Sequence, residues 1–231
     1  NQLRHNLRSK AVLCPGLEVN FDNQMNNTRD KWLYQDGIKD YLQATLDGLN
    51  CLPSSPFVTS FKSKEDQLDC ALTWTENSTI ITTESYVNLI PTVGGGTHVN
   101  GLRSGLTDAL KEFCEFRNLI PKNIKLTPDD VWQKIAFVLS IKILDPQFSG
   151  QTKERLSSRE CASFVSGIVK DSFSLWLNQH TDIAEKIAEL AILNAQSRLN
   201  NTKKVVRKRI VSGPALPGKL SDCTSSNLSQ T

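Results

Sequence analysis

The sequence is poor in the residues that build metal centres and redox pairs. Only three histidines occur among its 231 residues, and they lie in separate segments, at His5, His98 and His180. The six cysteines are widely spaced, and nineteen positions separate the two nearest, Cys51 and Cys70. Zinc sites and redox dithiols need ligands only a few residues apart. We therefore predict no metal site and no redox-active cysteine pair.

Signatures of a self-contained active site are also missing. There is no Gly-x-Ser-x-Gly nucleophile motif, and no cysteine has an identifiable histidine partner. Gly94-Gly95-Gly96 precedes a predicted helix, but it lacks the Gly-x-Gly-x-x-Gly spacing and the later acidic residue of a dinucleotide site. The chain by itself is therefore predicted to be catalytically inactive.

Long apolar runs are absent, and none reaches the roughly 18 residues of a membrane span. With 39% hydrophobic and 22% charged residues, the composition is that of a globular protein. A net charge of +3 is too small by itself to indicate nucleic-acid binding. Cys114 and Cys161 fall on apolar faces of predicted helices, which is typical of buried free thiols in a reducing compartment. We expect a cytoplasmic location, and we expect the polar start without methionine to lie inside a longer chain.

Helical and strand patterns alternate along the sequence. Helices are predicted over 3–12, 37–46, 99–117, 159–178 and 181–204, with one further turn after Thr127. Strands are predicted over 17–21, 31–34, 57–61, 68–74, 79–83, 85–93 and 136–143. The pattern predicts an α+β protein, with a hairpin formed by 57–61 and 68–74 and a break at Pro53 to Pro56.

Several helix ends carry specific signals. Asp36 is expected to cap the helix over 37–46, and Ser157 with Glu160 has the spacing of a capping box. His98 is expected to act as a cap at the start of its helix. Gly101 and Gly105 lie one helical turn apart, which predicts a close backbone approach there.

The strongest candidate site is the polar loop between the strand over 136–143 and the helix that follows. Its sequence runs from Asp145 to Arg155 and offers an amide, a hydroxyl and an ammonium in Gln151, Thr152 and Lys153. A lysine on a loop between a strand and a helix can contact an anionic ligand such as a phosphate. The alternative interpretation is an ordinary loop with a solvated lysine.

Basic residues outside this loop suggest contacts with DNA. Arg103 lies near a helix start, where the macrodipole favours acids, so another partner is expected. A basic run near the C-terminus includes Lys203, Lys204 and Arg207. It is interpreted either as a DNA-phosphate contact or as a solvated helix end.

Two motifs together resemble a known family. They are Gly95-Gly96-Thr97-His98-x-x-Gly101-x-Arg103 and Asp145-Pro146-Gln147-Phe148-x-Gly150-Gln151-Thr152-Lys153. In combination they are similar to the B subunits of bacterial type IIA DNA topoisomerases, and the similarity extends from about Ala11 to Leu220. The stretches 112–118 and 172–178 look more like the B subunit of topoisomerase IV than that of gyrase.

The resemblance implies a domain organisation. Residues 1–16 would end an ATPase domain, 17–205 would form a transducer domain, and 206–231 would be a basic and polar linker toward an absent Toprim domain. The implied fold is a mixed sheet with a left-handed β-α-β crossover, like domain 2 of ribosomal protein S five. A long C-terminal helical stalk would follow the sheet.

The resemblance also implies roles. Gln151, Thr152 and Lys153 would contact the terminal phosphate of ATP in the neighbouring ATPase domain. Arg103, Lys203, Lys204 and Arg207 would face DNA. The whole protein would use ATP and Mg, would dimerise, and would join the A subunit of topoisomerase IV in an A2B2 assembly for ATP-driven relaxation and decatenation. The chain would couple ATP binding and hydrolysis to DNA strand passage.

Two rival interpretations remain open. The first is a stand-alone nucleic-acid-binding β-α-β domain without ATP coupling, which tight, strongly salt-dependent DNA binding by the chain would favour. The second is a plain cytosolic scaffold that binds neither nucleotide nor DNA.

Overall fold

A computed structural model describes the backbone of residues 2–75 and 82–210 and the side chains of residues 3–75 and 82–201. Contacts divide the chain into two units, residues 1–195 and 196–231, and each is described by itself. The helices are α1 (Gln2–Leu13), α2 (Ile38–Thr45), α3 (Thr97–Phe116), α4 (Pro128–Trp132), α5 (Arg159–Gln179) and α6 (Thr181–Ile210). The strands are β1 (Val19–Asn23), β2 (Thr28–Trp32), β3 (Cys51–Lys62), β4 (Gln67–Thr75), β5 (Thr83–Val87), β6 (Ile90–Pro91) and β7 (Ile135–Lys142).

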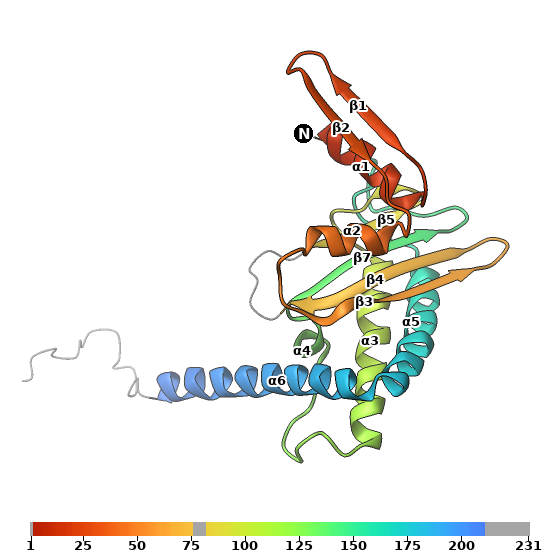
Figure 1. Cartoon of the computed structure of the whole chain (residues 1–231). Coiled ribbons are helices and arrows are strands. Elements are labelled where there is room, and N and C mark those ends of the chain that lie inside the picture. Colours follow the sequence, from red (N-terminus) through yellow and green to blue (C-terminus); the bar gives the residue numbers. More distant parts are fainter. Residues whose placement is uncertain (1, 76–81, 211–231) are drawn as a thin grey trace, which may run out of the picture. The chain divides into compact units, whose positions relative to one another are not determined.

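Five strands form one mixed sheet in the order β3-β4-β7-β5-β6 (Figure 1). All neighbouring pairs are antiparallel except β5 and β7, which are parallel. Parallel neighbours need a crossover connection, and here β6, α3 and α4 lie between them in the chain. The predicted α+β class and mixed sheet are confirmed.

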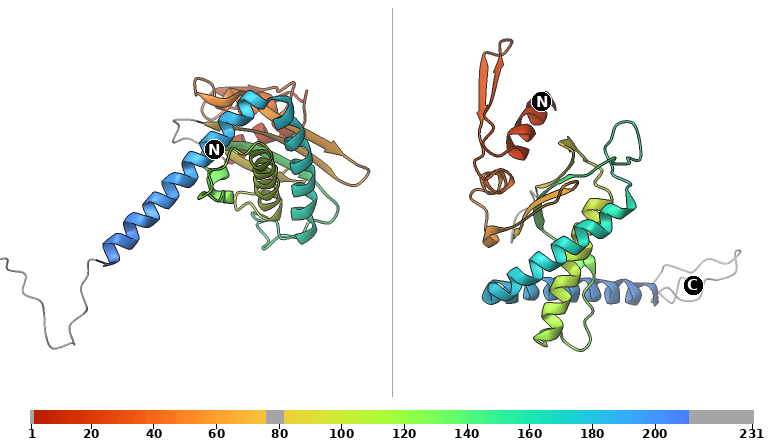
Figure 2. Two further views of the ribbon diagram at one scale, coloured as in Figure 1. Left: turned by 90° about the horizontal axis from the view of Figure 1, so that it is seen from below. Right: turned by 90° about the vertical axis from the view of Figure 1, so that its right-hand side faces the viewer.

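The sheet is buried on both faces because its central strands carry apolar residues at nearly every position. On β7, Phe137 and Leu139 belong to the cluster that includes α3 and α5, whereas Ala136 and Val138 belong to the cluster that includes α1 and α2. Alternate residues of a strand point to opposite faces, so one strand supplies both cores. Figures 1 and 2 show the sheet between α2 on one side and α3 with α5 on the other.

Helices α3 and α5 pack closely through small residues. A β-carbon built on Gly101 would lie 2.4 Å from the carbonyl oxygen of Ala162, and one on Gly105 would lie 2.6 Å from that of Ser166. Only glycine leaves room for a backbone at this distance. The predicted close approach at Gly101 and Gly105 is confirmed, and its partner is α5.

A separate two-stranded hairpin follows α1, in which β1 and β2 pair only with each other (Figure 1). Arg4 of α1 forms an ion pair with Asp30 of β2. Farther along α1, the Lys10 ammonium donates a 2.6 Å hydrogen bond to the carbonyl of Leu89, next to β5. Helix α1 is therefore attached to both the hairpin and the large sheet.

Three sequence predictions about element ends are wrong. Strand β3 continues through Pro53 to Pro56 with a shift of register between Leu52 and Phe57. Proline is tolerated there because β3 is an edge strand. Helix α2 has Gly37, not Asp36, as its N-cap, and the Asp40 carboxylate accepts the Asp36 N–H instead.

The third error concerns α6, which runs to Ile210, beyond the predicted end at Lys204. The basic run at Lys203, Lys204 and Arg207 is thus helical, but its side chains lie outside the described ones, as do residues 211–231. Among residues 2–75 and 82–210, no helix combines the length and apolar character needed to cross a membrane.

Candidate functional site

The loop after β7 is an ordered finger. Its stem is an antiparallel bridge between Phe148 and Leu156, extended by a 3.0 Å hydrogen bond from the Ser149 N–H to the Arg155 carbonyl. Its tip closes with a hydrogen bond from the Lys153 N–H to the Gly150 carbonyl. All three predicted contact residues are exposed at this tip, namely Gln151, Thr152 and Lys153. The structure thus brings them together on one projection.

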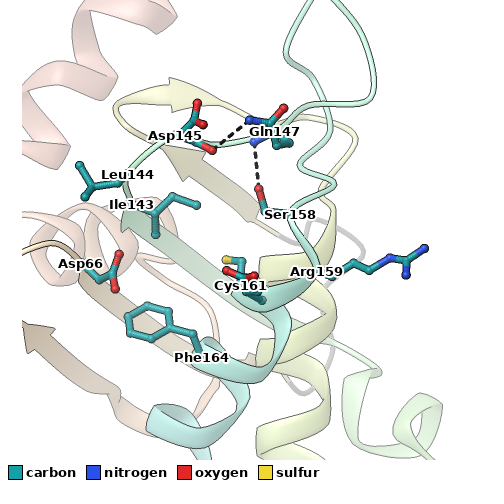
Figure 3. Close-up of a pocket in the computed structure, with 10 residues that line it drawn as sticks. Asp66, Ile143, Leu144, Asp145, Gln147, Ser158, Arg159, Cys161 and Phe164 are labelled. Carbon is teal, nitrogen blue, oxygen red and sulfur yellow. Dashed lines mark hydrogen bonds between the residues drawn. The ribbon is translucent and has the colours of Figure 1, made fainter.

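Two serines fix the base of the finger. Ser157 donates both its N–H, at 2.8 Å, and its hydroxyl, at 3.0 Å, to the Gln147 carbonyl. The Gln147 N–H in turn donates to the Ser158 hydroxyl at 2.9 Å, as Figure 3 shows. The predicted capping box is therefore wrong: Ser158 is the N-cap of α5 and makes no side-chain capping bond, because both serine hydroxyls bind Gln147.

The triple glycine forms the second support of the finger. Gly94 donates its N–H to the Glu154 carbonyl at 2.9 Å, and Leu156 donates to the Gly95 carbonyl at 3.0 Å. Leu156, which is 1% exposed, inserts into the core. The sequence pattern predicted only a helix start for this segment, since its partners lie about 60 residues away.

A third support is Asn88, in the turn between β5 and β6. Its side-chain amide donates to the Ile143 carbonyl and accepts the Ile143 N–H, each at 3.0 Å. Sequence reasoning missed this residue because it predicted one continuous strand over 85–93, whereas the chain turns at Asn88 and Leu89 between β5 and β6.

Lys153 has an unusual backbone. Its φ of 56° lies in the left-handed region that favours glycine. Its ammonium lies 5.9 Å from the centroid of the Phe148 ring, and no ion pair of Lys153 is found among the described side chains. An exposed ammonium without a carboxylate partner is available to an anion.

A cavity of about 470 Å³ lies beside the base of the finger (Figure 3). Ile143 and Phe164 supply apolar walls, Asp66 and Asp145 supply carboxylates, and the Arg159 side chain points away. The three tip residues, 151–153, do not line it. The tip of the finger is therefore a projection rather than part of this cavity.

Arg103 is placed on α3, away from the finger's own contacts. Its guanidinium pairs with Asp129 at the start of α4 and lies 5.8 Å from the Trp132 ring centroid. The side chain is 33% exposed. The Arg103 guanidinium can still bind an anion from solvent, but only in competition with Asp129.

His98 is not a helix cap. It is fully buried, and its Nε2 lies 3.1 Å from the Thr92 hydroxyl. Burial lowers the pKa of His98 from 6.5 to about 4, so the imidazole is neutral at physiological pH. Its position ties the start of α3 to the segment that leads into the triple glycine.

The predicted buried thiols at Cys114 and Cys161 are confirmed. Burial raises the pKa of Cys114 to about 11 and that of Cys161 to about 12, which makes both thiols unreactive. Within residues 3–75 and 82–201, no three His, Cys, Asp or Glu side chains come together as a metal site.

Comparisons with known proteins identify the family of the chain. The family model described as DNA gyrase B matches residues 37–206. The B subunit of DNA topoisomerase 4 from Salmonella typhimurium is 57% identical over 231 residues, which are 100% of this chain and 37% of that protein. The Haemophilus influenzae protein of the same name is 59% identical, with the same coverage. The chain thus spans little more than a third of the length of these relatives.

Two solved structures are similar in fold. The topoisomerase IV ATP-binding domain of Francisella tularensis, in complex with a small-molecule inhibitor, has a TM-score of 0.74 and 39% identity, covering 86% of this chain and 53% of that one. The 43K ATPase domain of Thermus thermophilus gyrase B, in complex with an aminocoumarin, has a TM-score of 0.75 and 26% identity, covering 91% and 56%. On the strength of the family model, which matches more than half of its residues, the chain belongs to the DNA gyrase B family.

Proposed function

We propose that the chain is the transducer segment of an ATP-dependent type II DNA topoisomerase, in a B subunit of the topoisomerase IV kind. The carrying observation is the exposed Lys153 ammonium on a finger whose base is hydrogen-bonded to the N-cap residue of α5 and to the segment before α3. The high identity to the B subunit of DNA topoisomerase 4 over the whole chain supports this proposal.

The domain organisation belongs to the same proposal. Residues 1–16 end an ATPase domain, 17–205 form the transducer, and 206–231 lead to a Toprim domain. The crossover from β5 to β7 is left-handed, and α6 is the helical stalk. The parallel pairing of β5 with β7 and the 30-residue length of α6 are compatible with this assignment.

Lys153, with Gln151 and Thr152, contacts the terminal phosphate of ATP bound in the neighbouring domain. A charge-assisted hydrogen bond of this kind contributes about 1.5–3 kcal/mol. A conformational equilibrium responds only to a ligand that contacts its two states differently. Loss of the phosphate therefore releases the tip, and the finger's base transmits the change to the sheet and helices as a rigid-body movement.

The remaining components belong to the whole protein. ATP and Mg²⁺ bind there, with most of the nucleotide site outside this chain, and among residues 3–75 and 82–201 no three His, Cys, Asp or Glu side chains come together as a metal site. Arg103, Lys203, Lys204 and Arg207 face DNA. The whole protein functions in the cytoplasm as a dimer, together with the A subunit of topoisomerase IV. In this assembly ATP drives strand passage, relaxation and decatenation.

Replacing Lys153 by alanine in the complete subunit tests the proposal. ATP turnover is expected to fall by about ten-fold or more, because a charged phosphate contact is lost. Lys64→Ala removes another exposed lysine, on the β3–β4 turn, and is expected to leave turnover unchanged. Full turnover in Lys153→Ala would refute the phosphate contact.

Two further measurements separate the parts of the proposal. Calorimetry is expected to show no ATP binding by the isolated chain, because the nucleotide pocket lies in another domain. ATP-dependent decatenation, compared with supercoiling by the complete subunit with its partner, distinguishes the topoisomerase IV kind from gyrase.

A further inference from the structure

We propose that Asn88 is a positioning residue for the Lys153 finger, and that the Asn88–Leu89 turn is the common attachment point of that finger and helix α1. This inference rests on the proposed function of Lys153 for its effect on ATP turnover. The structural part of it, that Asn88 holds the finger in place, does not depend on that function.

Asn88 secures the point where the chain leaves the sheet. The parallel pairing of β5 with β7 ends at Val87 and Ile141. Two residues later, the Ile143 N–H donates to the side-chain oxygen of Asn88, and the Ile143 carbonyl accepts from the side-chain amide. The Asn88 N–H donates to the Ile141 carbonyl at 2.9 Å. The side chain thus extends the strand pairing by one more residue pair. Without the Asn88 side chain, the chain would leave the sheet at the end of β7, and with it the chain stays bonded to the sheet as far as Ile143.

The turn that carries Asn88 has a specific backbone. Asn88 and Leu89 have φ values of 48° and 65° and connect the paired residues Val87 and Ile90. Two consecutive residues with positive φ are typical of a tight two-residue hairpin turn. Leucine is rarely found in this region, so the turn is held in a defined, costly conformation.

The same turn receives a bond from α1. The Lys10 ammonium donates to the Leu89 carbonyl at 2.6 Å, one residue from the side chain that holds Ile143. Helix α1 and the finger are therefore attached to neighbouring residues of one turn. A displacement of α1 reaches the start of the finger through two hydrogen-bonded contacts.

The consequence concerns the position of Lys153. Its finger has supports at Gln147, at Leu156 and at Ile143, and only the last is shared with α1. Removing it lets residues 143–146 move and reduces the fraction of molecules with Lys153 correctly placed. Apparent ligand affinity falls in proportion to that fraction.

The test uses Asn88→Gly in the complete subunit. Glycine retains the positive φ and removes only the side-chain amide. Asn118→Gly is the matched control, since Asn118 also has a positive φ, 55°, and lies exposed at the end of α3. Amide hydrogen exchange over residues 143–149 is measured together with KM and kcat for ATP. Both variants are also combined with Lys153→Ala.

In Asn88→Gly, exchange over 143–149 is expected to accelerate and KM for ATP to rise about three- to ten-fold, the range for losing one or two hydrogen bonds. In the Lys153→Ala background, Asn88→Gly is expected to raise KM for ATP no further. Asn118→Gly is expected to change neither the exchange nor KM. Unchanged exchange would overturn the positioning role. An equal rise in KM for ATP with and without Lys153 would show that Asn88 does not act through that residue.

A failure of the proposed function is distinguishable from a failure of this inference. If Lys153→Ala keeps full turnover, the phosphate contact is refuted, while the exchange measurement still decides whether Asn88 holds the finger. The α1 connection is tested by Lys10→Met, for which faster exchange of residues 87–91 is expected. Unchanged exchange there would overturn the connection to α1.

Discussion

Gly96 lies directly against the backbone of Leu156. A β-carbon at Gly96 would be 2.3 Å from the Leu156 carbonyl oxygen and 2.6 Å from its nitrogen, and Gly96 has a φ of 134°. Both the space and the backbone conformation therefore require glycine. This contact joins the start of α3 to the base of the finger.

Gly96→Ala is accordingly expected to lower the free energy of unfolding by more than about 2 kcal/mol, because neither backbone can move without breaking the finger's hydrogen bonds. Urea unfolding of the chain measures the change. Gly150→Ala, in the same finger with open space around it, is the control and is expected to stay within about 0.5 kcal/mol. Equal stability of the two variants would contradict the contact.

The helix pair α3 and α5 gives a second comparison among glycines. Gly101→Ala and Gly105→Ala are each expected to lower the free energy of unfolding by about 2 kcal/mol or more, because their β-carbons meet the backbone of α5. Gly167→Ala, on α5 with nothing near it, is expected to gain about 0.5–1 kcal/mol from helix propensity. Thermal unfolding of the three variants checks the opposite signs.

Stability is expected to depend on pH through His98. Its pKa is lowered by burial from 6.5 to about 4, so between these values the unfolded chain binds a proton that the folded chain does not. The contribution of His98 to the free energy of unfolding is therefore complete above pH 6.5. It is lost as the pH falls toward 4, and the loss is on the order of 3 kcal/mol.

His98→Gln, which can keep a hydrogen bond to Thr92, removes this titration. Its stability is expected to vary less than that of the original chain between pH 6.5 and 4 when both are followed by urea unfolding. Substitution of the exposed His180 by glutamine serves as the control. Parallel pH profiles for His98→Gln and the original chain would disprove the buried, neutral state.

The pairing of Arg103 with Asp129 leads to a prediction about DNA. If Arg103 meets a phosphate, Arg103→Gln in the complete subunit reduces the slope of log affinity against log salt by about one. Asp129→Asn removes the competing carboxylate and is expected to raise affinity at low salt. Titrations of DNA binding at several salt concentrations measure both effects. Unchanged slopes would remove Arg103 from the DNA-facing surface.

Local patterns in the sequence predicted most elements, because periodicity and breakers act over a few residues. The strands β4 and β7, the helices α3 and α5, and the one-turn helix α4 after Thr127 were all predicted correctly. The capping box at the start of α5 was predicted wrongly because its serines bind another part of the loop. Ser157 and Ser158 have the composition of a cap, yet their hydroxyls bind Gln147.

The candidate site also has one part that local sequence predicts and another part that depends on distant contacts. Residue types and spacing are enough to predict that Gln151, Thr152 and Lys153 form a polar tip between a strand and a helix. The contacts that hold this tip in place are seen only in the folded chain. Gly94–Gly96 and Asn88 lie far from the finger in sequence. The glycines act through main-chain hydrogen bonds and close contact, and Asn88 acts through its side-chain amide. Such contacts depend on where the sheet places two distant segments, and no local pattern records that placement.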